Sequence, residues 1–136
     1  MAIFKEEYGL DDFCKNVVSD IETRCVNYCY KKRLSETVRF AVKHGYDTFS
    51  TTLLVSPYQK HDEIIKVCQE LEALSGIKFL YRDFRVGFRE GQSKARAAGL
   101  YMQKYCGCIF SEEDRYEKQI ARDLASCSPV SATTEI

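Results

Sequence analysis

Helical and β-rich segments alternate along the middle of this chain, and that order restricts the folds open to it. Apolar side chains recur at helical spacing over residues 29–43, and Gly45 stands where a C-cap glycine belongs. Residues 48–55 are β-rich and predict a strand. A second helix opens at Asp62, and a second strand follows at residues 77–81. This order implies an α/β fold whose parallel strands are joined by helical crossovers.

Shorter helices are predicted on both sides of this unit. Asp11 or Asp12 can cap the first, a second covers residues 92–98, and a third begins at Ser111. Their apolar side chains expected to face inward are Phe13, Val17, Val18, Tyr116, Ile120 and Leu124. We predict one α/β domain over residues 1–125, followed by a disordered tail at 126–136.

Composition excludes several classes of protein. Twenty basic and twenty acidic side chains balance among 136 residues, so no global field draws the chain to nucleic acid or to a membrane. A polyanion would have to be held by a local patch. The sequence has neither a membrane-spanning apolar run nor a secretory signal, which predicts a cytoplasmic protein. Seven cysteines, an odd number, favour reduced thiols, metal ligation or catalysis over a disulfide framework.

Two short clusters hold four of these cysteines: Cys25 with Cys29, and Cys106 with Cys108. The first pair is about one helical turn apart beside Arg24, so both sulfurs can face one point and ligate a metal as thiolates. The second pair encloses a glycine and can close into a small strained disulfide, which is easily reduced and reformed. Neither spacing matches a standard zinc ribbon, so ligation and redox chemistry both stay open, against the alternative of incidental pairs.

The other cysteines and the two histidines have less specific surroundings. Cys14 and Cys68 lie in apolar helical stripes, where a small buried side chain is the expected role, and Cys127 lies in the predicted tail. His44 precedes a C-cap glycine and is expected to interact with helix carbonyls. His61 is therefore the better functional histidine.

Two loops follow the predicted strands, at the sheet edge where open parallel sheets bind ligands. Residues 56–61 offer a hydroxyl, an aromatic ring, a cation and an imidazole. Residues 82–89 alternate arginine with aromatic groups, a mixture that contacts phosphate and stacks on bases. The alternative for the second loop is a solvated turn with Phe84 and Phe88 packed in the core.

Four blocks of the chain, residues 24–34, 51–61, 81–85 and 99–108, resemble in the same order the QueH-type epoxyqueuosine reductases. The resemblance runs from about Arg24 to Tyr116. It implies reduction of the epoxide of epoxyqueuosine to queuosine at the wobble position of tRNA. It also implies a Rossmann-like α/β layer (HUP/PP-loop-like), a 4Fe-4S cluster and room for a second iron.

Carried over by motif, Cys25 and Cys29 resemble cluster ligands, and Cys106 and Cys108 resemble a redox-active disulfide pair. His61, Tyr58 and Asp83 are the candidates for protonating the opening epoxide oxygen or for orienting it. The side chains assigned to substrate binding are Thr51, Thr52, Tyr58, Arg82, Arg85, Gln103, Lys104 and Tyr105.

The chain departs from the family pattern at two points. Cys25 and Cys29 are separated by three residues, whereas the family spaces this pair by two. Family members also begin with a strand and an adjacent-cysteine segment, and this chain starts after the place of that segment. We therefore expect a sheet without its first strand, and cluster ligands that come from an N-terminal partner chain or a second copy. The electron donor is not identified by the sequence.

Two alternatives from other classes remain. One is a non-catalytic tRNA-binding or metal-binding module, and the other is a simple dithiol oxidoreductase that uses only Cys106 and Cys108. An unstable fragment is a third outcome, which cooperative unfolding would exclude.

Overall fold

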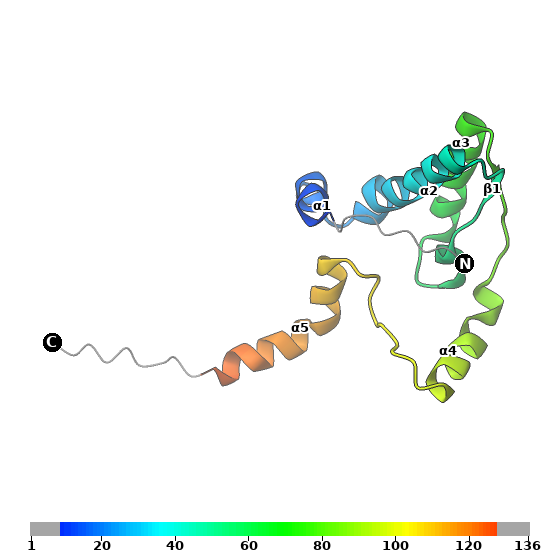
Figure 1. The fold of residues 1–136 in the computed structure, drawn as a ribbon. Coiled ribbons are helices and arrows are strands. Elements are labelled where there is room, and N and C mark those ends of the chain that lie inside the picture. The colour runs from blue at the N-terminus through cyan, green and yellow to red at the C-terminus, as the bar shows by residue number, and fades with distance from the viewer. Residues whose placement is uncertain (1–8, 128–136) are drawn as a thin grey trace. The chain divides into compact units, whose positions relative to one another are not determined.

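The computed structural model describes residues 9–127, which belong to two compact units, Met1–Lys94 and Ala95–Ile136. The elements of the first unit, in chain order, are α1 (Leu10–Val17), the π-helical turn η1 (Cys25–Cys29), α2 (Tyr30–His44), β1 (Thr48–Phe49), the 3-10 helix η2 (Thr52–Val55), α3 (His61–Ser75), β2 (Lys78–Phe79) and the 3-10 helix η3 (Arg85–Gly87). Helix α4 (Phe88–Ala97) follows, and α5 (Ile109–Ser126) lies in the second unit. Figure 1 shows their order along the chain.

The sheet of the first unit has two parallel strands, β1 and β2, with α3 as the connection between them. Phe49 pairs with Phe79, and their rings lie 5.5 Å apart. Main-chain hydrogen bonds extend the ladder at both ends, from Lys78 N to Asp47 O (2.8 Å) and from Leu80 N to Phe49 O (2.9 Å). This mostly helical structure with a small parallel sheet is compatible with the predicted α/β class.

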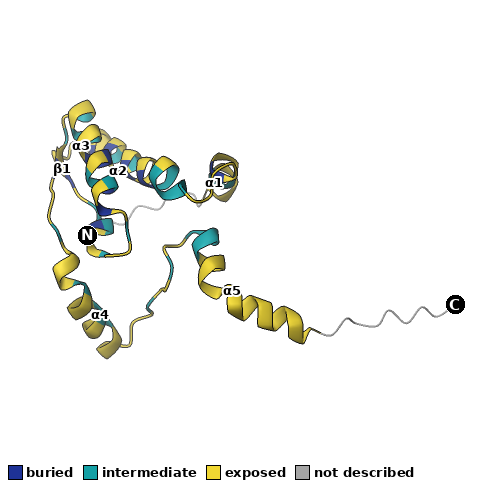
Figure 2. Ribbon diagram, turned by 180° about the vertical axis from the view of Figure 1, so that it is seen from behind, coloured by how far each residue is buried: buried dark blue, intermediate teal, exposed yellow. Residues whose placement is uncertain are grey.

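The core lies where α2 and α3 pack against each other and against the strands. Helix α2 contacts α3 and β1, and α3 contacts β2 and η2. Figure 2 shows buried residues on both α2 and α3. The buried cluster comprises Tyr30, Leu34, Val38, Phe49, Leu54, Ile64, Val67, Cys68 and Phe79. Burial of these apolar side chains is the main favourable term in folding of the unit.

Both central helices form where the sequence predicts them, and each ends at a glycine with a left-handed backbone, Gly45 (φ 73°) and Gly76 (φ 74°). The first predicted strand is too long. Only Thr48–Phe49 forms a strand, because the Thr51 hydroxyl accepts the Leu53 N–H (3.2 Å) and starts the η2 turn. A side chain that binds its own backbone in this way competes with sheet pairing.

Several boundaries outside the core also differ from the prediction. Gly9, rather than Asp11 or Asp12, stands at the α1 N-cap position, and Val18 is exposed while Val17 is buried. Helix α4 begins at Phe88 instead of residue 92, because the η3 turn leads directly into it. Helix α5 begins at Ile109, two residues before the predicted start.

The second unit has no buried residue between Ala95 and Cys127. The expectation that Tyr116, Ile120 and Leu124 face inward is therefore wrong for the described structure, where they are 36%, 44% and 68% exposed. Within this unit the Tyr105 ring packs on Tyr116, with ring centroids 6.3 Å apart. One partner ring is too little apolar surface to cover the stripe.

In residues 9–127 no helix is both long and apolar enough to cross a bilayer. The tail predicted at 126–136 lies outside the described residues from position 128 onward.

We expect opposite effects of alanine at two glycines. Gly45→Ala should lower the free energy of unfolding by about 1 kcal/mol, because φ of 73° strains a residue with a Cβ. Gly91→Ala should raise it by up to about 1 kcal/mol, because Gly91 lies inside α4, has no left-handed φ and faces open space. Urea unfolding of both variants measures the difference, and equal signs would contradict the backbone argument.

Candidate functional site

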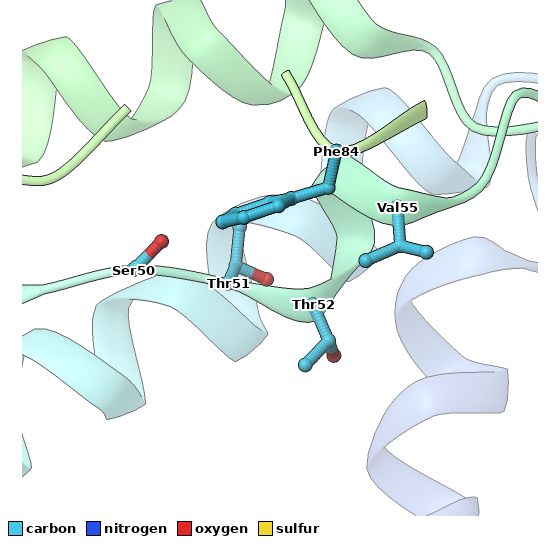
Figure 3. Close-up of a pocket in the computed structure, with 5 residues that line it drawn as sticks. All are labelled: Ser50, Thr51, Thr52, Val55 and Phe84. Atoms are coloured by element: carbon cyan, nitrogen blue, oxygen red, sulfur yellow. The ribbon is translucent and has the colours of Figure 1, made fainter. Parts of the chain in front are cut away.

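The carboxyl ends of β1 and β2 lie at the same edge of the sheet because the strands are parallel. The segments that follow them form an open pocket of about 370 Å³ at that edge. Its lining residues are Ser50, Thr51, Thr52, Val55 and Phe84. Figure 3 shows the Phe84 ring lying alongside Thr51, with Val55 at the other end of the pocket. This is the position at which open α/β sheets bind ligands.

The pocket combines an aromatic ring with hydroxyl groups whose backbone partners hold them in place. Thr51 Oγ1 accepts from Leu53 N, and Ser50 Oγ donates to Leu80 O (3.0 Å). The Thr51 hydroxyl keeps a proton to donate, and the Ser50 oxygen keeps lone pairs to accept. Phe84 is 40% exposed, so the alternative of a fully buried ring is wrong. A planar heterocycle with polar edges fits such a lining.

His61, the first residue of α3, is 6% exposed. Its Nε2 lies 3.2 Å from the Tyr81 hydroxyl, and the two rings meet edge to face. Its Nδ1 is buried and has no hydrogen-bond partner within residues 9–127. The sequence points to His61 but gives no signal for Tyr81 as its partner, since the two are twenty residues apart.

Asp83 and Arg85 form a bidentate ion pair beside this histidine. Arg85 Nε and Nη2 donate to the two Asp83 carboxylate oxygens (2.9 and 2.6 Å), and the Arg85 N–H donates to Oδ1 (3.0 Å). These bonds hold the pKa of Asp83 well below its usual range. Asp83 therefore stays ionised near neutral pH, which favours the orienting role over proton donation.

The first cysteine pair lies in the π-helical turn η1, directly before α2. Tyr30 N bonds to Cys25 O, the five-residue spacing that defines a π turn and that often marks functional sites. A hydrogen bond from Cys29 lowers the pKa of Cys25 to about 6, with smaller contributions from Arg24 and Lys60, against a rise from burial. Cys25 is therefore mainly a thiolate at neutral pH.

Tyr30 connects this turn to the loop at residues 56–61. The Tyr30 side chain is 3% exposed, and its hydroxyl accepts from Lys60 N (3.0 Å) and donates to Gln59 Oε1 (2.8 Å). The structure thus places the loop, including the Lys60 charge, beside Cys25. Tyr58 of the same loop is 85% exposed, with its ring 5.9 Å from that of Phe88.

The thiols of η1 partly fit the iron-sulfur cluster implied by the resemblance. A lowered Cys25 pKa and a sulfur partner in contact are what two neighbouring cluster ligands require. A 4Fe-4S cluster takes four thiolates, however, and residues 9–127 contain no group of three or more metal-ligating side chains. Within the first unit, the described residues therefore bring two candidate ligands together, Cys25 and Cys29.

Cys106 and Cys108 lie in the second unit, immediately before α5. Both are free thiols, with Cys106 exposed and Cys108 half-buried, and Gly107 between them has φ of 96°. Cys106 Sγ lies 3.1 Å from Ser111 Oγ.

Some of the remaining side chains predicted to bind substrate are already bonded within the protein, and others are not. Gln103 Nε2 donates to Tyr105 O (2.8 Å), so its amide is already used. Arg85 is paired with Asp83, whereas no ion pair within the described residues holds Arg82 or Lys104. Arg82 and Lys104 are thus the better candidates for phosphate contacts.

Of the remaining cysteines, Cys68 is fully buried in the core, as predicted, and burial raises its pKa to about 12. Cys14 is half-buried rather than buried. His44 Nδ1 lies 2.9 Å from Phe40 O, which confirms the predicted contact with a helix carbonyl.

Comparison with known proteins gives one consistent result. The family model described as epoxyqueuosine reductase QueH matches residues 1–114. The epoxyqueuosine reductase QueH of Dehalococcoides mccartyi is 34% identical over 116 residues, which cover 85% of this chain and 63% of that protein. The one of Thermotoga maritima is 38% identical over 97 residues, covering 70% of this chain and 48% of that protein. The chain thus spans about half to two thirds of the length of these relatives.

Proposed function

The chain belongs to the QueH family of epoxyqueuosine reductases, and from this membership we propose that it provides part of an enzyme that reduces the epoxide of epoxyqueuosine in tRNA to queuosine. The sheet edge with its pocket, the η1 thiols and the second-unit thiols are the parts it contributes. The β1, α3 and β2 segments form a βαβ unit, the element from which a Rossmann-like layer is built.

The observation that carries the proposal is the Cys25 and Cys29 pair with its lowered Cys25 pKa. In the proposed enzyme Cys25 and Cys29 would be two of the ligands of a 4Fe-4S cluster, and the cluster would supply electrons. Its remaining ligands would join these two sulfurs in the assembled enzyme. A thiolate held ready at neutral pH lowers the cost of binding iron because no proton has to leave first.

The substrate side of the proposal uses the pocket and the loops around it. Loss of the epoxide oxygen as water consumes two electrons and two protons. Phe84 offers a face for stacking the modified base, while Thr51 and Thr52 offer hydroxyls to its edges. His61, whose Nε2 contacts the Tyr81 hydroxyl, is the proposed proton donor, and the ionised Asp83 is the proposed group for orienting the epoxide oxygen.

Recognition of the tRNA itself is expected to depend on few phosphate contacts. Arg82 and Lys104 are the cations proposed for this role, and Tyr58 and Tyr105 offer rings for stacking. Because the chain has a formal net charge of zero, its affinity for tRNA should fall only shallowly with salt concentration.

The test is iron and acid-labile sulfide content, with an absorption spectrum, after anaerobic reconstitution of the full chain. We expect bound iron and sulfide that are lost in Cys25→Ala and in Cys29→Ala. Cys127→Ala is the matched control, because Cys127 is an exposed thiol at the end of α5 and belongs to neither pair. About four irons per chain or per dimer would be the value for one complete cluster.

Two results would redirect the proposal. Binding of tRNA without cluster formation would favour a non-catalytic module. A dithiol couple that depends only on Cys106 and Cys108 and persists in Cys25→Ala would favour a simple oxidoreductase.

A further inference from the structure

The residues around Cys106, Gly107 and Cys108 include one hydroxyl that the sequence did not indicate. Ser111 Oγ lies 3.1 Å from Cys106 Sγ and donates to the Cys108 carbonyl oxygen at 2.9 Å. One side chain therefore contacts both ends of the three-residue segment. Cys108 Sγ, in contrast, has no hydrogen-bond partner within residues 9–127.

The proton of this hydroxyl decides what Ser111 does to Cys106. A carbonyl can only accept, so the single Ser111 proton points to Cys108 O and the oxygen accepts from the Cys106 S–H. When Cys106 loses its proton, its sulfur becomes an acceptor and the Ser111 proton can turn to it. The Cys108 carbonyl then keeps the bond from the Glu112 N–H (3.0 Å), so this rotation leaves no carbonyl unsatisfied.

We propose that Ser111 is a positioning residue that makes Cys106 the thiol that attacks an incoming disulfide, and leaves Cys108 to resolve the mixed disulfide. This rests on the proposed function, in which the family resemblance gives this pair a redox role. Cys106 is exposed and has the switching hydroxyl, whereas Cys108 is half-buried and lacks it. Gly107, with φ of 96°, bends the backbone between the two sulfurs.

The reaction balances with a small-molecule disulfide as the oxidant. The Cys106 thiolate attacks one sulfur of the disulfide, and the first small thiol leaves with the proton that Cys106 lost. The Cys108 thiolate then attacks Cys106 Sγ, which releases the second small thiol and forms the Cys106 to Cys108 disulfide. Two electrons pass from the protein thiols to the small disulfide, and the reverse sequence returns them.

The test measures capture of oxidised glutathione by the reduced, chelator-treated full chain, with peptide mass spectrometry to assign each sulfur. Cys108→Ser traps the mixed disulfide on Cys106, and Cys106→Ser traps it on Cys108. We expect capture by Cys106 to be faster, and Ser111→Ala to slow it about fivefold, the scale of one charge-assisted hydrogen bond offset by reduced nucleophilicity. Capture by Cys108 should not change, and Ser111→Thr should restore the Cys106 rate.

Ser126→Ala is the matched control. Ser126 also lies on α5 and donates to the carbonyl three residues before it, Asp123 O at 2.8 Å, but within residues 9–127 it makes no hydrogen bond to Cys106 or Cys108. Equal slowing at both cysteines, no slowing at either, or faster capture by Cys108 would overturn the proposal. Because the assay contains neither tRNA nor iron, its failure does not depend on whether the chain reduces epoxyqueuosine.

Discussion

Alkylation of Cys25 is expected to reach half its maximal rate near pH 6 and to level off by about pH 8. The folded protein lowers the pKa of this thiol from 9.0 to about 6, mainly through the Cys29 hydrogen bond, so the reactive thiolate persists to lower pH than in an ordinary cysteine. Cys68 should stay unlabelled between about pH 5 and pH 9, because burial raises its pKa to about 12. Iodoacetamide labelling of the chelator-treated chain, resolved by peptide, measures both.

Variants around η1 separate the causes of this shift. Cys29→Ala should move the midpoint of Cys25 labelling upward by the largest amount, Arg24→Gln by less and Lys60→Gln by the least. A midpoint that does not respond to Cys29→Ala would contradict the hydrogen bond as the main cause.

Since the folded pKa lies below the ordinary one, the stability gained from the Cys25 thiolate is complete above pH 9 and is lost as the pH falls through 6.

The central elements were predictable because their signals are local and repeated. On α2, the stripe that includes Leu34, Val38 and Ala41 is buried, and Gly45 ends the helix as predicted. The short β1 strand was not predictable by the same means. Threonine favours strands on average, but at Thr51 its hydroxyl binds the Leu53 N–H and turns the chain.

The candidate site divides in the same way, into residues that the sequence indicates and partners that only the structure shows. Cysteine spacing and the composition of the loops indicated Cys25, Cys29 and His61 without any structure. The partners of these residues depend on contacts distant in sequence: Tyr81 on His61, and Lys60 near Cys25. Ser111 was expected to begin a helix. Its hydroxyl instead contacts the segment that holds the two thiols, since it donates to Cys108 O, which also accepts from Glu112 N.

Leu54→Ala is expected to lower the free energy of unfolding by about 2–5 kcal/mol, a large share of the total stability of a small domain. Leu54 is 0% exposed and lies in η2, between the residues that line the pocket, and α3 packs against this turn. Its loss leaves a cavity under the turn, which the surrounding helices fill only in part. Urea unfolding followed by circular dichroism measures the change.

Val55→Ala provides the control, because Val55 is the next residue of η2 but is 37% exposed and lines the pocket. Its substitution should cost less than about 1 kcal/mol, since it removes little buried surface. The two variants distinguish the two roles of this turn. Leu54 packs the turn against α3, whereas Val55 lines the pocket. Equal losses of stability would mean that the turn is held by its exposed side, and the position of the pocket at the sheet edge would then depend on something other than the core.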